Sequence, residues 1–254
     1  MFNLTNKINA RNSLFALSIT ALGFLIAPNS AQAMTLVNNA NFDDDDFKSL
    51  INQKEFTELF VAEGRIGDRG GAGEKELKIN GDVVDGAKVS TEEQFNWGNG
   101  SVYDFSLMYD GNKVTYELDG KTLSSEDFNG SANSIFLRTF AKENKGNNSN
   151  NFVTLKDLVF NGESIGSLSS LGGESKDVDY LQLKDISSPF TLTGKTSMSW
   201  TGNNPMRSNL AFQIKVGNSP TPTSVPEPGT IGAIFVTGMT GLGLSKKNKK
   251  DEEI

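Results

Sequence analysis

Residues 102–118 read Val-Tyr-Asp-Phe-Ser-Leu-Met-Tyr-Asp-Gly-Asn-Lys-Val-Thr-Tyr-Glu-Leu, and this stretch decides the fold class. From Tyr103 to Tyr109 every second residue is aromatic or leucine, and this period of two marks a half-buried β-strand. The turn residues Asp110-Gly111-Asn112 follow, and Lys113–Leu118 alternates again. Two alternating segments joined by Asp-Gly predict a β-hairpin.

Further strand-like segments recur between clusters of Gly, Asn and Asp. They are Ser134–Phe140, Phe152–Phe160, Tyr180–Leu183, Phe190–Thr193, Ser197–Trp200 and Leu210–Val216. Many short strands with little helix predict an all-β fold, a β-sandwich or jelly roll, as one domain over residues 59–217. A polar leader, residues 34–58, precedes it, and apolar spacing from Phe47 to Leu59 favours a short helix. The glycine-rich stretch Gly64–Gly73 is typical of a loop.

The N-terminus has the pattern of a secretory signal peptide. Lys7 and Arg11 form a positive region, Ser13–Ala27 is apolar, and Ala31-Gln32-Ala33 is an A-x-A cleavage site. We therefore expect export through the translocon and cleavage after Ala33. An uncleaved signal anchor is the alternative.

The C-terminus carries a second candidate sorting signal, which has three parts. Residues 218–228 form a proline-rich linker whose end contains most of a short motif. An apolar segment follows the motif, and a cluster of lysines, the basic stop, follows the apolar segment. The motif is Val225, Pro226, Glu227, Pro228 and Gly229, and the stop is Lys246, Lys247, Lys249 and Lys250. The prolines stiffen the motif, and the lysines favour the cytoplasmic side of a membrane. Gly229–Leu244 is about 24 Å long as a helix, which is short for a hydrocarbon core of about 30 Å. Temporary retention is therefore favoured over a permanent transmembrane anchor.

This tail resembles the PEP-CTERM sorting signal of exported Gram-negative bacterial proteins. Pro226-Glu227-Pro228, the apolar segment and the lysines carry the resemblance, and Asp251-Glu252-Glu253 after the lysines departs from it. The resemblance implies processing of residues 229–254 by an exosortase-type membrane enzyme. It also implies delivery to the cell envelope or outer surface, and an association with surface polysaccharide or biofilm.

The body of the chain is weakly similar to secreted β-sandwich modules of bacterial surfaces. Phe95–Gly100, Met198–Gly202 and Leu210–Gly217 give this similarity. It implies no particular site residues.

Composition excludes several kinds of chemistry. The formal net charge is −7, and the chain contains neither Cys nor His. Disulfides, the usual zinc ligands and the Ser-His-Asp and Cys-His catalytic arrangements are therefore excluded. An acidic chain with no basic patch is not expected to bind nucleic acid. No cofactor and no metal site are predicted.

Two local motifs were considered as ligand sites. Asp43–Asp46 could offer oxygen ligands to calcium, but an EF-hand would need Gly and Glu where Lys48 and Lys54 stand. A solvated acidic leader is favoured. Gly67–Lys75 is loosely similar to a phosphate-binding loop, but Glu76 replaces the required Ser or Thr. A surface loop is favoured there.

Three pairs of carboxylates could in principle serve a glycoside hydrolase. They are Glu92 and Glu93, Glu126 and Asp127, and Asp177 and Asp179. Such an enzyme needs two carboxylates facing each other across a sugar site, which proximity in sequence does not establish. Solvated pairs are favoured, and no catalytic residue is predicted.

Trp97 and Trp200 stand among Asn, Ser and Gly and are the candidate ligand-binding residues. Exposed rings of this kind stack on the C–H faces of sugars. Core packing is the favoured alternative for both, with Trp97 the better candidate for exposure. The sequence thus predicts an exported, non-enzymatic protein of the cell surface or extracellular matrix. A carbohydrate-binding module and a carboxylate hydrolase are the two alternatives.

Overall fold

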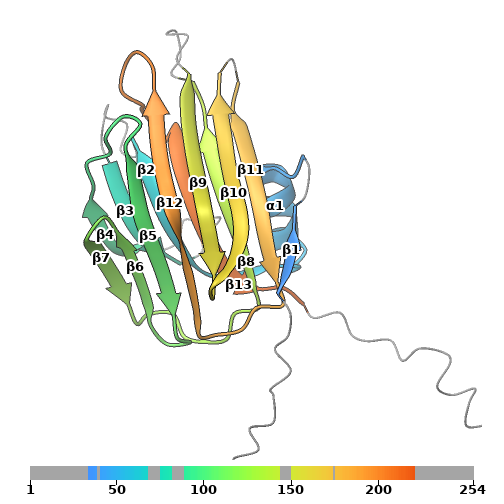
Figure 1. Cartoon of the computed structure of the whole chain (residues 1–254). Coiled ribbons are helices and arrows are strands. Elements are labelled where there is room, and N and C mark those ends of the chain that lie inside the picture. Colours follow the sequence, from blue (N-terminus) through green and yellow to red (C-terminus); the bar gives the residue numbers. More distant parts are fainter. Residues whose placement is uncertain are drawn as a thin grey trace, which may run out of the picture. The chain divides into compact units, whose positions relative to one another are not determined.

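The computed structural model describes residues 34–38, 41–67, 75–81, 89–143, 150–173 and 175–220. These residues form an all-β fold of two antiparallel sheets with one α-helix, α1 (Asp44–Asn52), as Figure 1 shows. The all-β prediction is confirmed. The predicted signal peptide up to Ala33 and the predicted sorting tail from Val225 lie outside the described residues.

The larger sheet has seven strands in the order β1-β11-β8-β13-β2-β3-β4. Their bounds are β1 (Thr35–Val37), β11 (Asp177–Lys184), β8 (Ser134–Ala141), β13 (Leu210–Asn218), β2 (Thr57–Ile66), β3 (Lys75–Asn80) and β4 (Val89–Gln94). Each neighbouring pair is antiparallel.

The smaller sheet has six strands in the order β10-β9-β12-β5-β6-β7. Their bounds are β10 (Glu163–Gly172), β9 (Asn151–Phe160), β12 (Phe190–Trp200), β5 (Val102–Tyr109), β6 (Val114–Leu118) and β7 (Lys121–Ser125). The last two strands in the chain, β12 and β13, lie inside the two sheets, so each sheet is completed only by residues from the C-terminal part of the domain.

The main core lies between the two sheets. In β5, Phe105, Leu107 and Tyr109 are buried in it, whereas Val102 and Met108 on the opposite face are 49% and 41% exposed. The period of two seen in the sequence therefore describes β5 correctly. Strand β6 pairs with β5 in register, which confirms the predicted hairpin.

Some segments differ from their predictions. Phe190–Thr193 and Ser197–Trp200 are one strand, because Gly194 stays in the ladder opposite Phe105. The helix begins at Asp44 and ends at Asn52, so Thr57–Leu59 belongs to β2 instead. Strand β2 runs on to Ile66, and the expected loop beginning at Gly64 is therefore strand at its start.

Both chain ends of the described domain lie at the same end of the seven-stranded sheet. Thr35 pairs with Lys184, Lys184 with Ser134, and Ser134 with Gly217, so these residues form one row across four strands. Beyond this row, the Asn133 side chain makes two 2.8 Å hydrogen bonds with the Ser219 backbone, donating to its carbonyl and accepting from its N–H. The point where the chain leaves the sheet is therefore fixed.

Gly64 lies close to two aromatic rings of the core. A Cβ at this position would lie 2.7 Å from Phe212 Cε1 and 2.8 Å from Trp97 Cζ2. We expect Gly64→Ala to lower the free energy of unfolding by about 1–3 kcal/mol, because two rigid rings must shift to admit the methyl group. Urea denaturation measures this. Gly173→Ala is the control: its Cβ would come no closer than 3.9 Å to Asn150 Oδ1, so we expect a change within about 0.5 kcal/mol. Equal effects of the two substitutions would contradict the packing argument.

Candidate functional site

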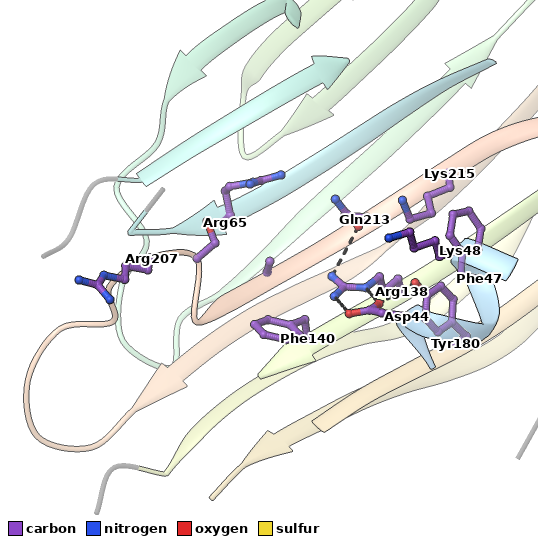
Figure 2. A pocket seen from close by; sticks show the side chains of 12 residues that line it. Asp44, Phe47, Lys48, Arg65, Arg138, Phe140, Tyr180, Arg207, Gln213 and Lys215 are labelled. Carbon is purple, nitrogen blue, oxygen red and sulfur yellow. Dashed lines mark hydrogen bonds and ion pairs between the residues drawn. The ribbon is translucent and has the colours of Figure 1, made fainter. Parts of the chain in front are cut away.

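A pocket of about 510 Å3 opens on the outer face of the seven-stranded sheet. It lies between α1, the strands β2, β8, β11 and β13, and the loop from β12 to β13, as Figure 2 shows. Its lining residues are Asp44, Phe47, Lys48, Arg65, Arg138, Phe140, Tyr180, Arg207, Ser208, Ala211, Gln213 and Lys215.

One wall of the pocket is the start of helix α1. The Asp43 carboxylate accepts hydrogen bonds from the backbone N–H groups of Asp45 at 2.8 Å and Asp46 at 3.2 Å. The Asp46 carboxylate in turn accepts from the Asp43 N–H at 3.1 Å, which completes a capping box. The acidic run considered as a calcium ligand or a solvated leader is therefore the cap and first turn of the helix, where carboxylates also favour the helix dipole.

An aromatic cluster holds the helix on the sheet. Phe47 is buried, and its ring centroid lies 5.2 Å from that of Phe136 on β8 and 5.7 Å from that of Tyr180 on β11. Phe56 and Phe42 complete the cluster, which is separate from the main core. The seven-stranded sheet is thus covered on both faces in this region.

A charged pair lies beside the aromatic cluster. Arg138 on β8 donates from Nε and Nη2 to the two carboxylate oxygens of Asp44, both at 2.6 Å. The Tyr180 hydroxyl donates to the same carboxylate at 2.9 Å. Only 11% of the Arg138 side chain is exposed. This bidentate contact therefore offsets most of the cost of burying the guanidinium charge.

These contacts set the protonation states. Burial alone would raise the pKa of Asp44, but the hydrogen bonds and charge of Arg138 outweigh it and hold the pKa below its ordinary value. Burial raises the pKa of Tyr180 far above the ordinary tyrosine value. At neutral pH the site therefore contains a carboxylate, a guanidinium and a neutral phenol.

A row of polar side chains crosses the sheet from this pair. The Arg138 Nη1 atom lies 3.5 Å from Gln213 Oε1 on β13, and Gln213 Nε2 donates to Glu63 on β2 at 2.8 Å. Glu63 also accepts from Asn80 at 2.7 Å and pairs with Arg65. Glu63 is only 1% exposed, and these three donors compensate its charge.

Lys215 forms the inner end of the pocket. Its ammonium group lies 3.3 Å from Glu58 and 4.6 Å from the centroid of the Phe47 ring. Burial lowers the pKa of Lys215, and Glu58 opposes this effect. Lys215 is therefore a structural cation that links β13, β2 and α1.

The opposite rim is a tight turn in the β12–β13 loop. The Asn209 N–H donates to the Met206 carbonyl at 3.1 Å, and Arg207 and Ser208 between them both have a φ of 54°. Two positive φ values in a four-residue turn are usually supplied by glycine or asparagine. The turn packs on the end of β2, where a Cβ at Gly67 would lie 2.5 Å from Met206 Cα.

The two tryptophans do not line this pocket. Trp97 is 1% exposed and packs edge-on against Phe95, Tyr103 and Phe212 in the core. The prediction that Trp97 is the more exposed of the two is therefore wrong, because neighbouring aromatic rings enclose it. Trp200 is half-buried, and its backbone exchanges two hydrogen bonds with the Asn99 side chain.

The predicted carboxylate pairs are engaged elsewhere. On β4, Glu92 and Glu93 reach different partners, Lys78 on β3 and Lys121 on β7. The partner of Glu126 is Lys113, and Asp127 accepts from Ser90 at 2.5 Å. On β11, Asp177 accepts from the Leu171 N–H and Asp179 from the Ser170 hydroxyl. Most of the loop Gly67–Lys75 lies outside the described residues.

Among the described residues, no group of three or more acidic side chains is arranged to hold a metal ion. Within those ranges no helix is long and apolar enough to cross a membrane. Comparison with protein-family models and with curated protein sequences found no match.

The sequence did not predict this site. Its residues come from five separated segments, and no local spacing joins them. One signal was present, since Gln213 and Lys215 interrupt the apolar strand segment Leu210–Val216. A buried strand that places polar residues on one face indicates partners covering that face.

Asp44→Asn tests the link between helix and sheet. We expect the variant to lose about 1–3 kcal/mol of stability at neutral pH, since it weakens a charge-assisted contact with a largely buried guanidinium. Because the folded pKa of Asp44 is depressed, its contribution is complete above the unfolded pKa of about 4 and disappears as the pH falls through the folded value. The stability gap between wild type and variant should therefore close in acid. Urea denaturation across this pH range measures it.

Asp45→Asn is the matched control. It removes the same charge from the same helical turn, but the exposed Asp45 side chain has no partner among the described residues. An equal loss in both variants would mean that the helix dipole, and not the Arg138 contact, accounts for the effect.

Proposed function

We propose that this protein is an exported, non-enzymatic cell-surface or matrix protein whose β-domain binds polysaccharide in the pocket between α1 and the seven-stranded sheet. The observation that carries the proposal is the pocket itself, which joins the half-buried ring of Phe140 to the hydrogen-bonding side chains of Gln213 and Arg138. The Arg138 guanidinium covers one face of the Phe140 ring, with Cζ 4.9 Å from the ring centroid, so a sugar would contact the part of the ring that stays exposed. An aromatic ring suits the C–H surface of a sugar, and amide and guanidinium groups suit its hydroxyls.

The chemistry of the pocket favours binding over catalysis. Among the residues that the structure describes, Asp44 is the only carboxylate in the lining, and both of its oxygens are held by Arg138. Its lowered pKa makes it a poor proton donor at neutral pH. Glycoside hydrolysis requires a second carboxylate across the site, so a hydrolase receives no support here.

The position of the pocket suits a domain tethered by its C-terminal segment. The row containing Ser134 and Gly217 lies where the chain leaves the sheet, and Arg138 and Gln213 lie four residues further along. This separation is about 14 Å at the rise of an antiparallel strand, and Arg207 lies beyond the far end of β13. The pocket therefore lies away from the row at which the chain leaves the sheet.

The proposal includes the two trafficking signals. Residues up to Ala33 would act as a signal peptide, and the motif from Val225 to Gly229 would be the PEP-CTERM signal read by an exosortase-type enzyme. The proline-rich linker over residues 218–228 would separate the β-domain from the envelope.

Processing can be tested by the intact mass of the protein isolated from its own host. We expect a mass that lacks the residues up to Ala33 and those after the Pro226–Gly229 region. A protein that retains Lys246–Ile254 would support a permanent anchor and contradict sorting.

Binding can be tested on the full-length chain in a non-ionic detergent, with a panel of neutral and acidic polysaccharides. The probe variant is Ala211→Trp, because Ala211 lies in the pocket floor beside Phe140 and a large side chain there would fill the space. We expect affinity for the bound polysaccharide to fall at least about tenfold, or about 1.4 kcal/mol. Isothermal titration calorimetry measures it, and Ala211→Ser is the control of similar size. Wild-type protein that binds no polysaccharide would refute the proposed function.

A further inference from the structure

The lining of the pocket is rich in cations although the protein is acidic. Among the described residues, Lys48, Arg65, Arg138, Arg207 and Lys215 line it, with Asp44 as the one acid. The whole chain carries a formal charge of −7, so this concentration of cations is local. A cationic concavity raises the local concentration of anions.

Three of these cations are already paired. Arg138 is held by Asp44, Lys215 by Glu58, and Arg65 by Glu63 and Glu76. They form the floor of the pocket, and their charges are largely compensated within the fold.

The remaining two cations, Lys48 and Arg207, have no hydrogen bond or ion pair with any residue that the structure describes. Both are exposed, Lys48 on helix α1 and Arg207 on the turn at the opposite rim (Figure 2). Between them lies Arg138, whose Nη1 atom makes only a long contact of 3.5 Å with Gln213 Oε1. The N–H groups of Nη1 therefore keep hydrogen-bonding capacity. The pocket therefore offers two separated, exposed cations to anionic oxygens, one on each rim.

The backbone at Arg207 is a second observation that favours function at this rim. A non-glycine residue with φ of 54° costs about 1–2 kcal/mol, and Ser208 next to it has the same φ. Such conformations persist where the surroundings impose them, and they concentrate at ligand sites. Here the strained turn holds, at the pocket mouth, an arginine that pairs with none of the described residues.

We infer that the ligand of this pocket is an acidic polysaccharide, whose sugar carboxylates bind Lys48 and Arg207 at the two rims while a ring packs on Phe140. The inference rests on the proposed function and names its substrate class. Carboxylate suits both cations, because guanidinium and ammonium groups make their strongest hydrogen bonds to anionic oxygens. A repeating polymer suits the separation of the rims: from Lys215 to Ala211 alone the pocket follows β13 for about 14 Å.

Two other anionic partners fit less well. A membrane surface or a nucleic-acid duplex presents an extended sheet or rod of negative charge, which the remainder of an acidic protein would repel. A single chain of a polysaccharide can enter a recessed pocket without bringing that charge against the acidic surface.

The test compares polygalacturonate with neutral dextran, using the full-length chain in non-ionic detergent and isothermal titration calorimetry. We expect polygalacturonate to bind and dextran to bind at least about tenfold more weakly. Affinity for polygalacturonate should fall as salt rises from about 0.05 to about 0.5 M, because screening weakens exposed ion pairs.

The variants are Arg207→Asn and Lys48→Gln. Asparagine tolerates a positive φ, so Arg207→Asn removes the charge while keeping or improving the stability of the turn. Each variant should weaken polygalacturonate binding about tenfold, as expected for a lost hydrogen bond to a charged group. Lys113→Gln is the matched control: it removes an equal charge from an exposed lysine outside the pocket, and we expect unchanged affinity.

The outcomes separate the two proposals. Equal binding of dextran and polygalacturonate, lost in Ala211→Trp but kept in Arg207→Asn, would overturn the acidic ligand and leave the proposed function intact. Binding to neither polymer, nor to any other polysaccharide, would overturn both. An equal loss in Lys113→Gln would reveal non-specific charge attraction and refute the site. Tighter binding to phosphatidylglycerol vesicles or to duplex DNA than to polygalacturonate would refute the choice of ligand.

Discussion

The ion pair between Arg138 and Asp44 is the contact on which the outer face of the seven-stranded sheet depends. Arg138 lies on β8, inside the sheet, where an uncompensated buried charge would cost several kcal/mol. Helix α1 supplies the compensation at its first residue, and Phe47 one turn later packs against Phe136 and Tyr180 beside it. The helix, its aromatic cluster and the pocket floor are therefore parts of one arrangement. The ion pair fixes the position of the helix on the sheet, and the aromatic contacts bury its apolar surface.

A strand could be predicted from the sequence where one of its faces is exposed to solvent and the other is buried. Strand β5 alternates visibly because Met108 meets solvent while Leu107 is in the core. Strand β2 is buried on both faces, and its polar residue Glu63 points into a covered network instead of solvent, so the segment gave no period-two signal.

The break predicted inside β12 has a different cause. Gly194 is required there because a Cβ would lie 2.9 Å from Leu158, and this need for close packing looks like a turn signal in the sequence.

The site could not be predicted in the same way, because its parts meet only through long-range pairing. Arg138 lies on β8 and Arg207 lies just before β13, two strands that are neighbours in space but distant in the chain, and Lys48 lies on α1. The prediction that Trp97 is the more exposed tryptophan was wrong for a related reason. Its glycine-rich surroundings suggest exposure, but the Gly98 N–H donates to the Tyr103 hydroxyl at 2.8 Å, and this contact folds the segment over the ring. Composition near a residue describes its chain neighbours and not the elements that cover it.

The division between paired and unpaired cations separates the needs of the fold from those of a ligand. The fold requires Arg138 and Lys215, since each compensates a carboxylate and neither reaches far into solvent. It makes no comparable use of Arg207, whose side chain has no partner among the described residues and whose positive φ is unfavourable for an arginine. A turn serving only to connect β12 with β13 would be more stable with glycine or asparagine at that position. The arginine is therefore better explained by what enters the pocket than by what builds it, and the same reasoning applies to Lys48 on the facing helix.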